Sequence, residues 1–162
     1  MPIPAVILTA AQNYKFNSDF LPKMVSDLKP EEWLKRPADN LNPIAWIVGH
    51  CVWTRKALLA RLGTEWDKPW MGMFARGVKL DNDAAFPSDA ALLDAWRESA
   101  LMLDAALENA SEELLARPVT QGPPSADGKM SGVVNFLATH ETYHIGQASY
   151  LRAWLGYKGL MG

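Results

Sequence analysis

The protein contains three histidines, and two of them are four residues apart. His140 and His144 lie in the stretch SGVVNFLATHETYHIGQASYLRAWL (residues 131–155), and His50 lies in a separate stretch, residues 42–62. An α-helix advances about 100° per residue, so side chains four residues apart point the same way, with Cβ atoms about 6 Å apart. This geometry suits two imidazoles bound to one metal ion.

Apolar residues at helical spacing place all three histidines on inward-facing sides. They are Val133, Phe136, Leu137, Leu151, Trp154 and Leu155 in the first stretch, and Trp46, Ile47, Trp53, Ala57 and Leu58 in the second. Three neutral imidazoles can hold a divalent ion and leave coordination positions open for water or substrate, as in catalytic sites. We therefore predict a shared metal site formed by His50, His140 and His144. The alternative is that each histidine is hydrogen bonded separately in the core.

Residues 140–144, H-E-T-Y-H, match the H-E-x-x-H signature of zinc proteases. Those enzymes take a third ligand from further along the chain, but no His, Asp or Glu follows His144. The extended H-E-x-x-H-x-x-G-x-x-H form fails as well, because positions 147 and 150 are Gln and Tyr. The sequence therefore argues against a protease. Glu141 points about 100° away from His140, and we expect a solvated carboxylate or one that supports a metal ligand.

Composition predicts one folded domain, residues 1–162, with 49% hydrophobic and 21% charged residues. The net charge of −2 removes the electrostatic case for nucleic-acid binding. Cys51 is the single cysteine, which excludes an intrachain disulfide and fits a reducing compartment; we expect a buried, apolar role for it. The N-terminus lacks a basic region before its short apolar run, and no segment reaches the roughly 18 to 20 apolar residues of a membrane span. We predict a cytoplasmic protein with no membrane partner.

Four long amphipathic segments predict an all-α, up-and-down four-helix bundle, with the site between the second and fourth helices. The first helix covers residues 5–28, and Pro22 should kink or break it near Asp19. The second helix begins with Asn42 as N-cap and Pro43 as its first residue, and it ends at Gly63.

The third helix begins at the N-cap Ser88 and continues to about Asn109. Residues 111–118 echo residues 30–37, a short helical turn, and each copy precedes a helix that carries an inward histidine. The last helix ends at Gly156, and the tail to residue 162 should be loosely held. The aromatic-rich residues 63–87 form a connection that lines a pocket or covers one end of the core.

The stretches Asn42–His50 (NPIAWIVGH) and His140–Gln147 (HETYHIGQ) together resemble the DinB-like superfamily, metal-binding four-helix bundles, and the resemblance covers most of the chain. It implies that the three histidines are the ligands of a zinc or nickel ion. It also implies that Gln147 hydrogen bonds a metal ligand and that Gly146 allows close helix packing.

The resemblance further implies a function, because the best-understood members are thiol-S-transferases and a thiol-dependent isomerase that use bacillithiol, mycothiol or glutathione. A thiol on an open position of the metal would lose its proton and attack an electrophilic substrate. The alternatives are a metal-dependent hydrolase and a non-catalytic metal-binding stress or scaffold protein. Arg55 and Arg76 are candidates to bind a substrate anion, and Tyr143 and Tyr150 could donate near the metal. Many members form homodimers, so a homodimer is expected.

Overall fold

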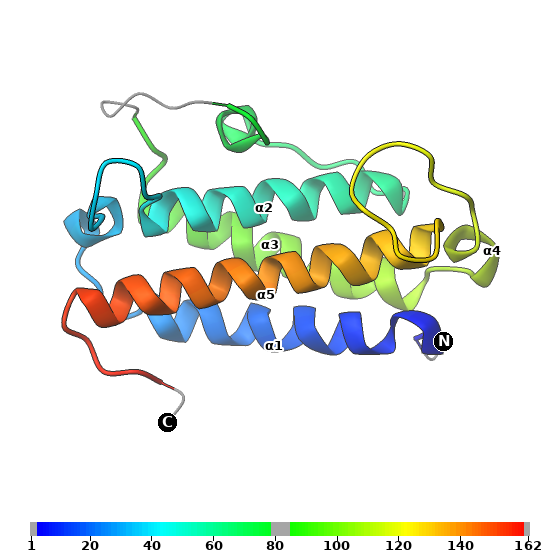
Figure 1. Ribbon diagram of the computed structural model, residues 1–162, viewed down its shortest axis with the longest axis horizontal. Helices are drawn as coiled ribbons and strands as arrows, with labels where there is room; N and C mark the ends of the chain where they lie inside the picture. The colour runs from blue at the N-terminus through cyan, green and yellow to red at the C-terminus, as the bar shows by residue number, and fades with distance from the viewer. Residues whose placement is uncertain (1–2, 79–84, 161–162) are drawn as a thin grey trace.

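The computed structural model describes residues 3–78 and 85–160 (Figure 1). Over these residues the chain is helical and forms no strand, with one isolated β-bridge between Pro118 and Lys129. The four long helices are α1 (Leu8–Val25), α2 (Ile44–Arg61), α3 (Asp89–Glu108) and α5 (Met130–Trp154). The short helices are η1 (Ala5–Ile7), η2 (Pro30–Leu34), η3 (Met71–Phe74) and α4 (Glu112–Leu115). The all-α prediction is confirmed.

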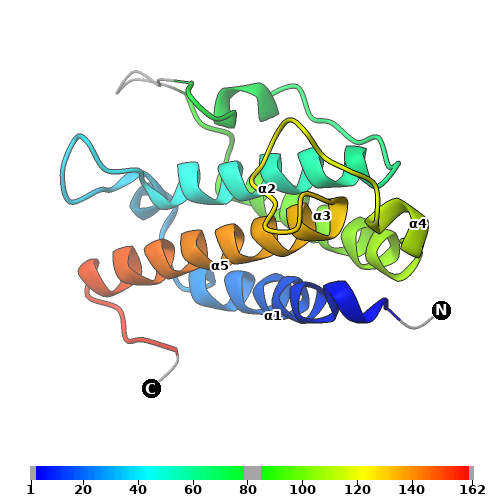
Figure 2. The ribbon, with the colours of Figure 1, turned by 45° about the vertical axis from the view of Figure 1, so that its right-hand side comes forward.

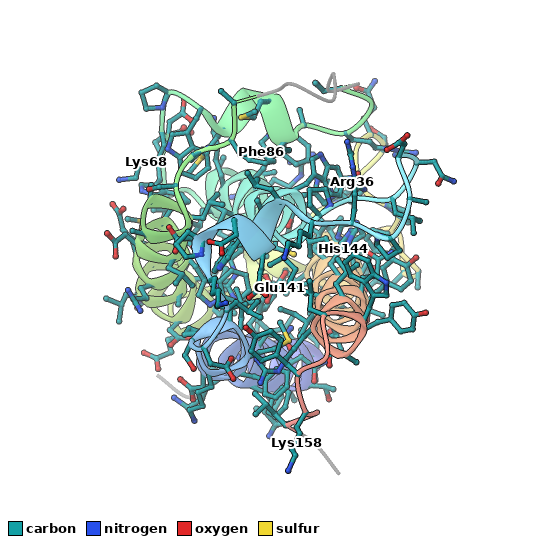
Figure 3. The ribbon with its side chains drawn as sticks, turned by 90° about the vertical axis from the view of Figure 1, so that its left-hand side faces the viewer. Arg36, Lys68, Phe86, Glu141, His144 and Lys158 are labelled. Atoms are coloured by element: carbon teal, nitrogen blue, oxygen red, sulfur yellow. The ribbon has the colours of Figure 1, made fainter. Side chains whose placement is uncertain are left out.

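The long helices do not pack in chain order. Helix α1 packs on α3 and α5, and α2 packs on the same two helices. The order around the core is therefore α1, α3, α2, α5, with α1 diagonally opposite α2, as the end-on view of Figure 3 shows. In each diagonal pair, α1 with α2 and α3 with α5, the two long helices follow one another in the chain.

The helix directions follow from two apolar clusters, one at each end of the core. One cluster contains the last residues of α1 and α5 and the first residues of α2 and α3, including Leu21, Met24, Ile44, Leu92 and Leu151. The other contains the opposite ends, including Ala10, Leu58, Leu103 and Val133. Helices α2 and α3 are therefore parallel, and the up-and-down prediction is wrong.

A long connection makes this parallel arrangement possible. The 18 residues of α2 span about 27 Å. Residues 62–78 run back along the outside of α2 through η3, and α3 begins at the same end as α2 (Figure 2). The connection therefore lies against α2, where it contacts the second-helix histidine described below.

Two of the predicted helix ends are confirmed by their capping geometry. Gly63 follows α2 with φ of +91°, and the Thr64 N–H donates to the Leu59 carbonyl at 2.9 Å. The Ser88 hydroxyl accepts a hydrogen bond from the Ala91 N–H at 3.2 Å, at the start of α3. The predicted start of α2 is wrong, because Pro43 has an extended ψ of 167° and is itself the N-cap.

Helix α1 is continuous through Pro22, so the proline does not break it near Asp19, and the alternative of a kink stays a prediction. Proline has no N–H to donate to the carbonyl four residues earlier, which is that of Ser18. Trp96 of α3 supplies the missing donor, because its indole N–H donates to the Ser18 carbonyl at 3.2 Å. The proline is tolerated because a neighbouring helix satisfies the carbonyl that it leaves unbonded.

The apolar side of α5 is narrower than predicted. Val133, Leu137 and Leu151 are buried, whereas Phe136 and Trp154 are 36% and 46% exposed.

None of the described helices has the length and apolar character needed to cross a membrane.

The segment after α5 is held in place by hydrogen bonds as far as Lys158. For these residues the prediction of a loosely held tail is wrong. Gly156 ends the helix with φ of +92°, as expected. The Tyr157 hydroxyl donates to the Glu32 carboxylate at 2.7 Å, and Arg152 donates to the Lys158 carbonyl at 3.0 Å. These contacts join the segment after α5 to η2 and to α5 itself.

Candidate metal site

The fold brings the three histidines together. His50 comes from α2, and His140 and His144 lie one turn apart on α5. One ring nitrogen from each lies within 4.8 Å of the others, and the Nε2 atoms of His140 and His144 are 3.1 Å apart. His50 and His144 are 6% and 7% exposed, so the site lies at the edge of the core.

The connection between α2 and α3 orients His50. Its Nδ1–H donates to the Phe74 carbonyl in η3 at 2.8 Å, which leaves the Nε2 lone pair available. Trp46 stacks on the imidazole with a centroid distance of 4.7 Å. A Cβ at Gly49 would lie 2.4 Å from the Phe74 ring, so the glycine permits this close approach. Of the two roles predicted for residues 63–87, the described part covers the core through Met71 and Phe74, and it also orients a histidine. Residues 79–84, which the same prediction covers, lie outside the described residues.

Gln147 orients His144, and its predicted role in supporting a metal ligand stays a prediction. The His144 Nδ1–H donates to the Gln147 side-chain carbonyl at 2.7 Å, so its Nε2 also presents a lone pair. The Gln147 amide then donates to the Tyr143 hydroxyl at 3.0 Å. Tyr143 is 63% exposed, and its ring lies 5.3 Å from that of His144. The prediction that Gly146 allows close helix packing is wrong, because a Cβ added at this position would meet nothing within 4 Å.

Burial favours the neutral form of all three imidazoles. Burial lowers the pKa of His50 and His140 below the usual value for histidine. Burial also lowers the pKa of His144 to about 4, against the opposing effect of the hydrogen bond with Gln147. The buried Nδ1 of His140 has no hydrogen-bond partner. Neutral imidazoles with converging nitrogens match the donor set of a divalent metal ion, so these residues fit such an ion.

Glu141 does not face the histidines. Its side chain has no exposed surface, and both carboxylate oxygens accept hydrogen bonds from Arg55, at 2.6 and 2.9 Å. Asn17 of α1 donates to the same carboxylate at 3.2 Å. Figure 3 shows Glu141 between the helices and His144 further toward the edge of the bundle. The expectation of a solvated carboxylate is wrong, and Glu141 is not placed as the general base of a zinc protease.

The structure does not bring Arg55 to the site as an anion-binding residue. The guanidinium is completely buried and also donates to the Ser18 hydroxyl at 2.9 Å. It lies 3.6 Å over the Trp96 ring. Arg55 is therefore part of the buried polar network that joins the four long helices.

The other predicted residues lie outside the histidine cluster. Arg76 is exposed two residues beyond Phe74, and its role stays a prediction. Cys51 is a buried core residue, as expected, and burial raises the pKa of its thiol well above the ordinary value. The hydrogen bond between His50 and the Phe74 carbonyl was not predicted, because every residue type carries a backbone carbonyl and the sequence does not distinguish one from another. Gly49 beside His50 was the available clue, since a glycine within a helix often marks a close approach.

A family model described as the DinB superfamily matches residues 16–148. The chain belongs to the DinB superfamily. The matched range includes all three histidines and Gln147. No match was found among curated proteins. Membership in the DinB superfamily agrees with the helical fold, and the three histidines of α2 and α5 could hold a metal ion.

Proposed function

We propose that this DinB-superfamily protein binds one divalent metal ion through His50, His140 and His144 and acts as a transferase that uses a low-molecular-weight thiol. The observation that carries this proposal is the convergence of three imidazole nitrogens within 4.8 Å. Among the described residues, no further Cys, His, Asp or Glu joins this cluster. Three protein ligands leave coordination positions for a substrate, and imidazole ligands suit zinc or nickel.

The chain's own residues favour a thiol over water as the nucleophile. When bound, the metal ion supplies a positive charge that lowers the pKa of a coordinated thiol or water. Hydrolysis by H-E-x-x-H enzymes also needs a glutamate that takes a proton from water, but Glu141 is already bound by Arg55 and Asn17. A thiol has an ordinary pKa of about 8.5, far below that of water, so a modest further lowering by the metal charge yields the thiolate near neutral pH without such a base.

Two residues of the protein keep the ligand nitrogens in position. Phe74 and Gln147 accept the Nδ1–H of His50 and His144, respectively, so the Nε2 atoms stay unprotonated and directed at one point. Both contacts come from the protein itself, and together they preorganise the ligand nitrogens. Preorganised ligands lose little conformational entropy when they bind a metal ion.

The first test is metal content, measured by mass spectrometry on the untagged full chain and on the His50→Ala and His144→Ala variants. We expect near-stoichiometric zinc or nickel in the parent and loss of the metal in both variants, with helicity by circular dichroism retained. The loaded parent is then assayed for conjugation of bacillithiol, mycothiol and glutathione to monobromobimane. Full metal occupancy without turnover of any thiol would favour the non-catalytic alternative, and absence of metal after reconstitution would overturn the site.

A further inference from the structure

A groove of about 720 Å³ lies beside the histidine cluster, between residues 37–42 and the outer face of α5. Its volume falls within the range of roughly 300 to 1,000 Å³ that is usual for small-molecule sites. Leu41 and Ile47 contribute apolar surface, and Asn40, Asn42 and Gln147 contribute side-chain amides. No charged side chain lines the groove among the described residues. Such a lining favours an uncharged ligand, because an ion would lose its hydration without a countercharge.

Two residues connect this groove to the histidine cluster. Gln147 lines the groove and also accepts the hydrogen bond from His144. Tyr143 lines the groove, and its ring edge packs near His144. Because the Tyr143 hydroxyl accepts from Gln147, its own proton remains available for an acceptor on a ligand. A ligand in the groove would therefore lie next to the residues that orient a metal-binding histidine.

We propose that this groove binds the electrophilic substrate of the transferase, as an uncharged molecule with an aromatic or apolar body and a carbonyl-type acceptor. The body packs on Leu41 and Ile47, and the acceptor receives the hydrogen bond of Tyr143. The ligand's role as an electrophile rests on the proposed function, but its binding in the groove does not.

Gly146 offers a direct way to close the groove. It lines the groove, and a Cβ built on it meets nothing within 4 Å, so a larger side chain extends into the open space. Leucine is also a better helix former than glycine, so Gly146→Leu should fold. The matched control is Ala105→Leu, which places the same side chain on an exposed position of α3 outside the groove.

The experiment titrates the metal-loaded full chain with benzamide, benzoate and benzamidine, which share one ring and carry charges of about 0, −1 and +1 at neutral pH. Binding is followed by ¹⁵N NMR at the backbone amides of Leu41 and Gly146 and at the side-chain amide of Asn40. We expect benzamide to bind at least about tenfold more tightly than either ion, a difference of about 1.4 kcal/mol. Equal binding of an ion, or shifts confined to residues outside the groove, would overturn the proposal.

The variants separate the groove from the rest of the molecule. We expect Gly146→Leu to weaken benzamide at least about tenfold with unchanged metal content, and Ala105→Leu to leave both unchanged. Tyr143→Phe should weaken benzamide about two- to tenfold, as expected for one neutral hydrogen bond. Undiminished binding to Gly146→Leu would contradict the assignment.

Failure of this inference is distinguishable from failure of the proposed function. Benzamide binding that persists in metal-free His50→Ala would support the groove even if no thiol is turned over. Turnover that benzamide does not inhibit, at concentrations that saturate the groove, would overturn the groove as the site of the electrophile and leave the transferase in place.

Discussion

The buried pair of Arg55 and Glu141 gives the most direct stability prediction. Both side chains are completely buried, and two hydrogen bonds join them. Removal of one partner from a buried ion pair leaves an uncompensated charge and typically costs about 3–5 kcal/mol. For a domain of this size, each kcal/mol shifts the melting temperature by about 2–4 °C. We therefore expect Glu141→Met to lower the melting temperature by about 6–20 °C.

The double variant Arg55→Met with Glu141→Met separates the charge effect from packing. It removes both charges while keeping side chains of similar length, and such replacements of buried ion pairs are often neutral or stabilising. Stability is measured by urea and thermal unfolding of the parent, both single variants and the double variant, followed by circular dichroism. We expect the double variant to be more stable than either single variant. Because each single variant should cost about 3–5 kcal/mol and the double variant less than either, we expect the cycle to give a coupling energy larger than about 3 kcal/mol.

Two results would refute this reasoning. If the free energy of unfolding of Glu141→Met lies within about 1 kcal/mol of the parental value, the ion pair does not stabilise the fold as its burial implies. If Glu141→Gln keeps the parental stability but abolishes turnover of loaded protein, the carboxylate takes part in the chemistry, as in the H-E-x-x-H proteases. Metal content is measured for each variant so that loss of the ion is not mistaken for loss of a base.

Two further predictions concern a glycine in α2 and the start of α5. Gly49→Ala places a Cβ against the Phe74 ring and should cost about 1–3 kcal/mol in urea unfolding and weaken metal retention against a chelator. Gly146→Ala, which meets nothing within 4 Å, should do neither, and equal effects of the two changes would contradict the packing argument. Asp127 accepts a hydrogen bond from Ser131, which lowers its pKa to about 2. Because this folded pKa lies below the unfolded value of about 3.9, its stabilisation is present above pH 4 and is lost as the pH falls toward 2. Asp127→Ala should therefore lower the melting temperature at pH 7 by a difference that disappears between pH 4 and 2; a constant difference would show that its charge is not responsible.

The histidine cluster was predictable because its geometry is local. The four-residue spacing of His140 and His144 fixes their common direction on a helix, and the apolar residues around them fix which side faces inward. The position of His50 followed from the same pattern on a second helix. The hydrogen-bond partners were less accessible, since Gln147 is on the same helix but the Phe74 carbonyl belongs to a distant connection.

The ion pair of Arg55 and Glu141 was missed although the sequence carries a signal for it. Arg55 interrupts the buried stripe of α2, and Glu141 interrupts that of α5. Opposite charges that each interrupt an apolar stripe on two different helices are expected to pair, because neither can be buried alone. Motif matching drew attention to Glu141 as part of H-E-x-x-H and away from its place in this stripe.

Helix direction could not be read from the periodicity. Apolar spacing defines the inward face of α2 and α3, but the face is the same whether the two helices are parallel or antiparallel. The length of residues 62–88 was the relevant observation, because a short connection forces neighbouring helices to be antiparallel and a long one does not. The same limit applies to Pro22, whose effect depended on Trp96 in another helix.

The place of α5 in the chain has a consequence for biosynthesis. Arg55 is synthesised 86 residues before Glu141, whose carboxylate it binds, and Asn17 is synthesised 124 residues before the same carboxylate. A ribosome adds residues N-terminal first, so α1, α2 and α3 emerge before the helix that completes both the buried ion pair and the histidine cluster. A nascent chain lacking α5 holds an arginine in an apolar stripe and one histidine without the other two. We therefore expect such intermediates to stay partly open and to depend on chaperones until α5 has been synthesised, and products truncated before α5 to be removed by proteases.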